Sequence, residues 1–239
     1  MTLTTEIIEK YHAILDRGLS SGIGKRDGQM CIEAAVCAAL DLPHGDDPGC
    51  VGLSVRSFKI GLNVAKWSSP QARAAGLRDL GIAQIGSLGV VSDVDFSRIV
   101  RQKTINILIP ALFREVFASD SSEHVRCREA ADKCETADAA RAADAARAAA
   151  YAAGAAYAAR AAADAADAAA YASYAARAAA DAADAAARAA YAARAAAYAA
   201  DAAGTDKYLI MSAGFALDAL RELKSPGCEW LTAYRKGLK

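Results

Sequence analysis

Few prolines, a balanced charge and the lack of any long apolar run are the first features of this sequence. None of the five prolines lies between Ala137 and Gly204. Lysine and arginine together equal aspartate and glutamate at 28 residues each, so no net charge draws the chain to a phosphate backbone or to an anionic membrane surface. No stretch reaches the roughly 18 to 20 uncharged apolar residues that a membrane-spanning helix needs. We therefore expect neither nucleic acid nor a membrane as a partner.

The N-terminus also lacks the features of a secretory signal. Its residues carry acidic side chains at an amphipathic spacing, where a signal peptide has a basic start and an apolar run. We therefore expect a cytoplasmic protein. Disulfides are rare in reducing compartments, so the six cysteines are expected to be free thiols or metal ligands. They are Cys31, Cys37, Cys50, Cys127, Cys134 and Cys228.

What the sequence has in excess is alanine. Between Ala137 and Gly204, 46 of 68 residues are alanine, and at most three alanines follow one another before another residue type intervenes. Alanine has the highest intrinsic helix propensity, and no proline interrupts this stretch. The segment is therefore predicted to be helical, and the whole chain is predicted to be all-α because no strand pattern occurs elsewhere.

The other residues of this stretch recur every three or four positions, with a mean spacing of about 3.3 residues. From Tyr157 a 17-residue repeat of one tyrosine, one arginine and two aspartates is visible, with one change in the third copy. The opposite side of such a helix carries only methyl groups, which lets a second helix approach to the short end of the roughly 8 to 10 Å interaxial range. One unbroken helix would be about 100 Å long. We therefore expect a break at Gly154 or Ser173, giving long antiparallel helices that pack like a coiled coil, as a hairpin or a bundle.

The tyrosines and arginines of the repeat form a stripe along the predicted helices. One interpretation is that the stripe keeps an alanine-rich helix soluble. The other is that it contacts a partner, because Tyr and Arg frequently dominate binding interfaces. The candidate interaction residues are Tyr157, Arg160, Tyr174, Arg177, Tyr191 and Arg194.

Outside the alanine-rich stretch, apolar spacing and capping residues predict further helices. They cover about residues 4–17, 28–40, 54–67, 70–81, 92–117 and 206–224. Asp27 and Asp206 are expected to cap the second and the last of these, and Pro110 is expected to kink or break the fifth. We expect Ser225-Pro226-Gly227 to end the last one. Residues 1–120 are predicted to form a helical N-terminal domain, and residues 121–239 an alanine-rich helical repeat region with a C-terminal helix.

One cluster of reactive side chains lies around the second predicted helix. Cys31 and Glu33 are near its start, and His44, Asp46 and Cys50 are in the loop that follows. Because a helix N-terminus favours a thiolate, Cys31 could be a nucleophile with His44 as the base and Asp46 to orient it. Alternatively, Cys31, His44 and Cys50 could hold zinc, together with Asp46. The third interpretation is structural, with Cys31 in the core and His44 and Asp46 forming a turn.

Two segments carry a resemblance to known proteins. Gly28–Ala35 and Pro43–Val51, followed by the alanine-rich tail, resemble a group of uncharacterised bacterial and phage-associated proteins. This resemblance covers most of the chain and implies no activity. The tail alone resembles alanine-rich helical immunity proteins of toxin systems, which implies that it binds a protein.

We therefore expect a non-enzymatic helical interaction or structural protein. It is expected to associate with itself through the alanine surface, as a homo-oligomer, or to bind a protein partner, and to need no cofactor. The alternative is a thiol-dependent enzyme or a zinc-binding protein centred on Cys31, His44, Asp46 and Cys50.

Overall fold

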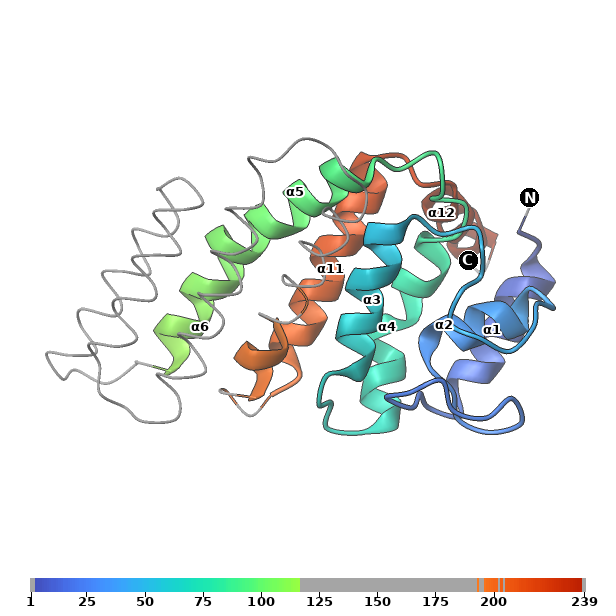
Figure 1. The fold of residues 1–239 in the computed structure, drawn as a ribbon, viewed down its shortest axis with the longest axis horizontal. Coiled ribbons are helices and arrows are strands. Elements are labelled where there is room, and N and C mark those ends of the chain that lie inside the picture. The colour runs from blue at the N-terminus through green and yellow to red at the C-terminus, as the bar shows by residue number, and fades with distance from the viewer. Residues whose placement is uncertain (1–2, 117–192, 194–195, 202, 204, 238–239) are drawn as a thin grey trace, which may run out of the picture.

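The protein consists of helices joined by loops in the residues that its computed structural model describes (Figure 1). These are residues 3–116, 193, 196–201, 203 and 205–237. No strand occurs in these ranges, and the only sheet-like pairing there consists of isolated bridges from Leu19 and Gly24 to Met30. The prediction of an all-α fold is confirmed for this part of the chain.

The helices keep the order in which the sequence predicts them, with two additions. They are α1 (Thr5–Leu15), α2 (Ile32–Ala39), α3 (Leu53–Val64), α4 (Pro70–Ala83), α5 (Asp93–Lys103), the π-helical turn η1 (Thr104–Leu108), α6 (Ile109–Val116), α11 (Lys207–Glu222) and α12 (Pro226–Gly237). The additions are η1 and α12.

Short polar side chains begin several of these helices. The hydroxyls of Thr4, Ser69 and Ser92 each accept a hydrogen bond from the backbone amide three residues later. Such a bond satisfies one of the amides that a helix start leaves without an intrahelical acceptor. Pro70 occupies the first position of α4, where its missing N–H costs no hydrogen bond.

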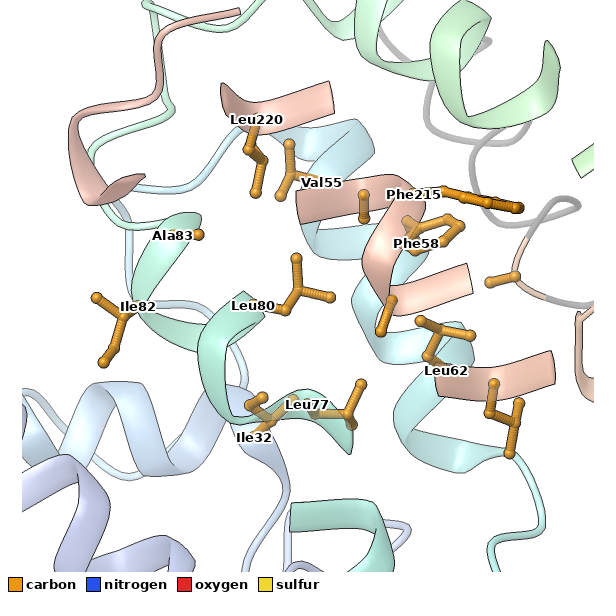
Figure 2. Packing of buried hydrophobic residues seen from close by; sticks show 14 of the residues in the cluster. Ile32, Val55, Phe58, Leu62, Leu77, Leu80, Ile82, Ala83, Phe215 and Leu220 are labelled. Carbon is orange, nitrogen blue, oxygen red and sulfur yellow. The ribbon is translucent and has the colours of Figure 1, made fainter. Parts of the chain in front are cut away.

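One hydrophobic core joins the N-terminal and C-terminal helices. α4 packs against α1, α2, α11 and α12, and α11 packs also against α5 and α3. Figure 1 shows α11 lying between α5 and the pair α3–α4. Figure 2 shows side chains of α2, α3, α4 and α11 meeting in this core, among them Ile32, Phe58, Leu80 and Leu220. Residues 207–237, which the sequence assigns to the second region, thus share their core with residues 3–116.

Glycines permit two of the closest approaches between these helices. A Cβ atom on Gly81 of α4 would lie 1.9 Å from the hydroxyl oxygen of Tyr11 in α1. A Cβ atom on Gly227 of α12 would lie 2.1 Å from the carbonyl oxygen of Ile82. Since real Cβ atoms do not come this close to other atoms, both contacts require glycine.

The described end of the alanine-rich stretch is helical and buried. Ala193, Ala196, Ala199 and Ala200 are between 0% and 4% exposed and belong to the hydrophobic core. At this end of the stretch the methyl groups therefore pack inside the molecule. The expected breaks at Gly154 and Ser173, and the six residues of the tyrosine and arginine stripe, lie outside the described residues.

Polar contacts connect α6 to the start of α11. The carboxylate of Glu115 accepts a hydrogen bond from the Tyr208 hydroxyl at 2.9 Å and forms an ion pair with Lys207. These hydrogen bonds lower the pKa of Glu115. The end of α6 and the start of α11 therefore lie next to each other, at the Glu115 carboxylate.

Two capping predictions are wrong. Asp27 does not cap α2, which begins at Ile32 after Cys31, because the backbone carbonyls of Gln29 and Met30 bond to the preceding loop and hold it extended. Asp206 occupies the N-cap position of α11 without capping it, since its carboxylate accepts a hydrogen bond from the Ser68 amide at 2.9 Å instead.

The two proline positions agree with expectation only in part. Pro110 does not break the helix, since the backbone widens into η1 just before it and continues as α6. A wider turn accommodates a ring that cannot donate to the preceding turn. Ser225-Pro226-Gly227 follows the end of α11 as expected, but Pro226 also begins α12, which the sequence does not predict. No helix in the described ranges is both long and apolar enough to cross a membrane.

Candidate functional site

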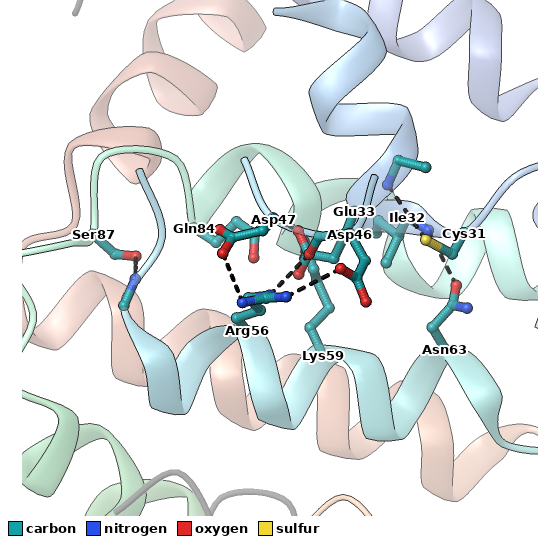
Figure 3. Close-up of polar contacts among 12 residues, drawn as sticks. Cys31, Ile32, Glu33, Asp46, Asp47, Arg56, Lys59, Asn63, Gln84 and Ser87 are labelled. Carbon is teal, nitrogen blue, oxygen red and sulfur yellow. Dashed lines mark hydrogen bonds and ion pairs between the residues drawn. The ribbon is translucent and has the colours of Figure 1, made fainter. Parts of the chain in front are cut away.

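A completely buried ion pair joins α2 to α3. Lys59 Nζ lies 2.9 Å from Glu33 Oε1, and both side chains are 0% exposed. The second carboxylate oxygen of Glu33 accepts a hydrogen bond from Gln84 Nε2 at 3.0 Å. Gln84 follows the last residue of α4. One carboxylate therefore links three helices, and Figure 3 shows the polar residues around it.

Burial opposes both charges of this pair. It raises the pKa of the Glu33 carboxyl, and the attraction of Lys59 only partly offsets this effect. It also lowers the pKa of the Lys59 ammonium, against the effect of Glu33. A charge in a nonpolar interior is tolerated only when a partner compensates the lost hydration. The two residues therefore depend on each other, because removing either one leaves the other buried without its partner.

A half-buried arginine holds the neighbouring loop against α3, close to this pair. Arg56 of α3 donates hydrogen bonds to the Asp46 backbone carbonyl at 2.8 Å, to Asp46 Oδ1 at 3.1 Å and to Asp47 Oδ2 at 2.9 Å. The three bonds hold the loop of residues 43–50 against α3. Asp46 therefore binds Arg56 through both its side chain and its backbone carbonyl.

Cys31 is the N-cap residue of α2. Its sulfur accepts a hydrogen bond from the Ala34 amide at 3.3 Å, in the position that a serine oxygen usually occupies. Burial raises the pKa of this thiol more than the helix amides lower it, which disfavours the thiolate that the nucleophile interpretation requires. The side chain is 6% exposed. Cys31 thus acts as a protonated, buried cap at neutral pH.

The structure does not assemble the predicted cysteine, histidine and aspartate relay. The His44 ring Nε2 lies 3.3 Å from the Gly24 carbonyl oxygen, and no hydrogen bond connects His44 to Cys31 or Asp46 in the described ranges. Cys50 is a free, half-buried thiol whose backbone carbonyl accepts from the Leu88 amide. His44 and Cys50 therefore belong to loop contacts of their own.

Two of the predicted site residues do share a cavity. A space of about 110 Å³ opens beside α2 and is lined by Cys31, Glu33 and Asp46, with Asn63 and apolar residues around them. Asn63 is fully engaged there: Oδ1 accepts from the Ile32 amide, and Nδ2 donates to two loop carbonyls. His44 and Cys50 do not line this cavity.

Metal binding was a second interpretation of the same residues. No group of three or more His, Cys, Asp or Glu side chains that could hold a metal ion occurs among the described residues. Cys31, Cys37, Cys50 and Cys228 are all free thiols. In this part of the chain, the arrangement of side chains favours the structural interpretation of Cys31, in which it caps a helix within the core.

Lys59 and Gln84 are the site residues that the sequence analysis missed. A signal for Lys59 was present, since Val55, Phe58, Lys59 and Leu62 have the spacing of one helix face. A lysine on an apolar face indicates a buried charge that needs a carboxylate. Nothing comparable identifies Gln84, whose contact with Glu33 spans 51 positions of the sequence.

Comparison with known proteins adds no relative to this picture. Neither a protein-family model, nor a curated protein, nor a solved structure matches the chain. A function for this protein therefore has to be argued from its own geometry.

Proposed function

We propose that this protein is a non-enzymatic interaction protein in which a helical body carries an alanine-rich binding segment. The helical body is residues 3–116 and 205–237, and the binding segment is residues 121–192. The observation that carries the proposal is the junction at Glu115, which bonds to both Lys207 and Tyr208. It brings the two ends of the helical body together.

This junction makes the binding segment an insertion rather than a second half of the fold. Insertions are tolerated where the two connecting ends lie close together at the surface. The buried alanines from Ala193 to Ala200 support the same view, because they attach the far end of the segment to the core. Because both ends of the segment are attached to the helical body, the segment itself is available for a separate role.

The composition of the segment supports binding to protein. Its repeat places tyrosine and arginine at regular intervals in an alanine background, and these two residue types often provide the largest contributions to protein interfaces. With 28 basic and 28 acidic residues in the chain, long-range repulsion between copies is weak. The partner is accordingly a second copy or another protein, contacted through Tyr157, Arg160, Tyr174, Arg177 and Tyr191 of the segment and through Arg194, which follows it by two residues.

The state of Cys31 also supports a role without catalysis. A nucleophilic cysteine needs a substantial thiolate fraction or an adjacent base. Here burial raises the pKa of the thiol, and the imidazole of His44 contacts a backbone carbonyl instead.

Excision of the segment tests this proposal. Residues 121–192 are replaced by a Gly/Ser linker of about 12 residues, which spans roughly 20 Å. We expect the excised variant to remain helical and to unfold cooperatively as a monomer. The full chain is expected to form dimers or larger species by light scattering, or to retain a protein partner when purified from its own cells. A full chain that is monomeric and binds no protein contradicts the proposal, as does a variant that assembles equally well.

The alternative function is thiol chemistry or zinc binding at Cys31, His44, Asp46 and Cys50. One observation favours it, namely that Cys31 and Asp46 line one cavity. Its test is the reaction of the native protein with a thiol reagent, together with a measurement of bound zinc. Fast labelling that is lost in Cys31→Ser, or stoichiometric zinc, would favour this alternative over the interaction role.

A further inference from the structure

A second concave surface lies between the first and last helices, near the ends of the chain marked N and C in Figure 1. It is an open groove of about 350 Å³ between α1 and α12. Leu3 and Ile8 are buried and form its apolar floor. Trp230 and Tyr234, one turn apart on α12, line it as half-buried aromatic side chains. Its volume is within the usual range for small-molecule sites, roughly 300 to 1,000 Å³.

Among the described residues that line the groove, one carries a charge, and it is negative. This residue is Glu9 of α1, whose side chain is exposed to solvent. The remaining lining residues are apolar, aromatic or small, apart from one threonine. We propose that this groove binds a small organic cation, an ammonium group that carries apolar substituents. The apolar substituents lie against the floor, the cationic centre lies over the aromatic rings, and Glu9 balances its charge.

Two of the cations next to the groove are engaged by carboxylates outside it. Lys10 on α1 pairs with Asp41, and Arg235 on α12 pairs with Asp79, so both of these cations are held by carboxylates of other elements.

His12 lies behind the aromatic wall formed by Trp230 and Tyr234, and it adds no positive charge to the groove. The His12 ring packs edge-to-face on Tyr234, with ring centroids 5.5 Å apart. Burial and the neighbouring Arg78 lower the pKa of His12, which keeps its imidazole neutral at pH 7. The ring therefore supports Tyr234 from behind as an uncharged neighbour.

Intrinsic fluorescence of the full chain gives a direct test, because the protein has only two tryptophans. Trp67 is 6% exposed and donates its indole N–H to the Leu62 carbonyl, so it is shielded from solutes. Choline is the probe, and 3,3-dimethyl-1-butanol is its neutral isostere. We expect choline to change the Trp230 emission in a saturable way, and the alcohol to bind about ten-fold more weakly. Equal binding of the two molecules, or no saturable change with choline, would overturn the proposal.

Two matched substitutions on α1 separate a site from general electrostatic attraction. Glu9→Gln removes the carboxylate that lines the groove and is expected to weaken choline binding several-fold. Glu6→Gln removes an exposed carboxylate of the same helix that does not line the groove, and we expect it to leave binding unchanged. Both residues are exposed, so both variants should fold. Equal weakening by the two substitutions would show that choline responds only to surface charge.

A third variant tests the aromatic wall. Trp230→Leu is expected to abolish choline binding as followed by saturation-transfer NMR on the ligand signals. A circular dichroism melt checks that this half-buried substitution leaves the fold intact. If a folded Trp230→Leu variant still binds choline, the proposed contact between choline and the aromatic side chains is refuted. The Glu9→Gln variant tests the ionic contact separately.

Discussion

At the scale of single residues, the buried Glu33–Lys59 pair makes both of its members sensitive to substitution. Lys59→Met leaves a carboxylate at 0% exposure without its cation, and we expect a loss of about 3 to 5 kcal/mol in the free energy of unfolding. Replacing both residues, as Glu33→Leu with Lys59→Met, removes both charges and should restore most of this loss. Urea unfolding of the single and double variants measures the difference.

The exposed pair Lys10–Asp41 provides the control for this cycle. Its side chains are 42% and 82% exposed, so Lys10→Met is expected to cost less than about 1 kcal/mol. If the double variant at Glu33 and Lys59 were as unstable as the sum of its single variants, the two residues would not be coupled and the pair would not explain their burial.

His12 makes the stability depend on pH. Burial first, and Arg78 second, lower its pKa below the ordinary value of 6.5. The unfolded chain therefore takes up a proton at a higher pH than the folded protein does, so this contribution to stability is present above pH 6.5 and is lost as the pH falls through the folded pKa. Glu33 has a raised pKa and acts in the opposite sense. We therefore expect His12→Gln to lose less stability than the wild type as the pH falls below about 6.5, and equal losses in urea unfolding would contradict this expectation.

At the scale of helices, close packing at Gly81 gives a clear contrast with Gly214. Gly81→Ala places a methyl group against the Tyr11 ring and hydroxyl, which holds a bond to the Arg78 carbonyl. We expect a loss of about 1 to 3 kcal/mol, since α1 has to move away from α4. Gly214 lies on the exposed side of α11 with nothing within 4 Å of an added Cβ atom. Gly214→Ala should therefore raise stability by roughly 0.4 to 1 kcal/mol, and thermal unfolding of both variants checks the opposite signs.

Helix positions were predictable from local spacing, while helix ends depended on contacts that the sequence does not display. The apolar spacing of Ile8, Tyr11 and Leu15 predicts α1, and all three side chains are buried in the structure. The start of α2 was misplaced because bridges from Leu19 and Gly24 to Met30 hold the preceding loop extended, and no spacing in the sequence marks them. α12 was missed because Pro226 and Gly227 resemble a terminator when read alone. In the structure Gly227 donates to the Ile85 carbonyl, and the proline begins a new helix.

The same distinction applies to the candidate site. Cys31, Glu33 and Asp46 could be grouped from the sequence because one short helix and one loop connect them. Glu33 takes its role from Lys59 and Gln84, which come from α3 and from the end of α4. Asp46 takes its role from Arg56 of α3. Whether a carboxylate is catalytic or part of a buried ion pair depends on tertiary packing between helices that are far apart in the sequence. Local sequence patterns do not reveal this packing.

At the scale of the whole molecule, α11 and α12 are part of the core, so a chain that ends at Ser121 is expected not to fold. α11 alone buries Tyr208, Leu209, Phe215 and Leu220, each 7% exposed or less. At about 1.5 to 3 kcal/mol for each large side chain, their loss amounts to roughly 6 to 12 kcal/mol. A typical domain has a net stability of only about 5 to 15 kcal/mol. The truncated chain should therefore show low helicity by circular dichroism and no cooperative melt, whereas excision of residues 121–192 leaves both helices in place.

A cooperative melt of the chain ending at Ser121 would mean that residues 1–121 form an independent domain, and the binding segment would then belong to a separate C-terminal unit.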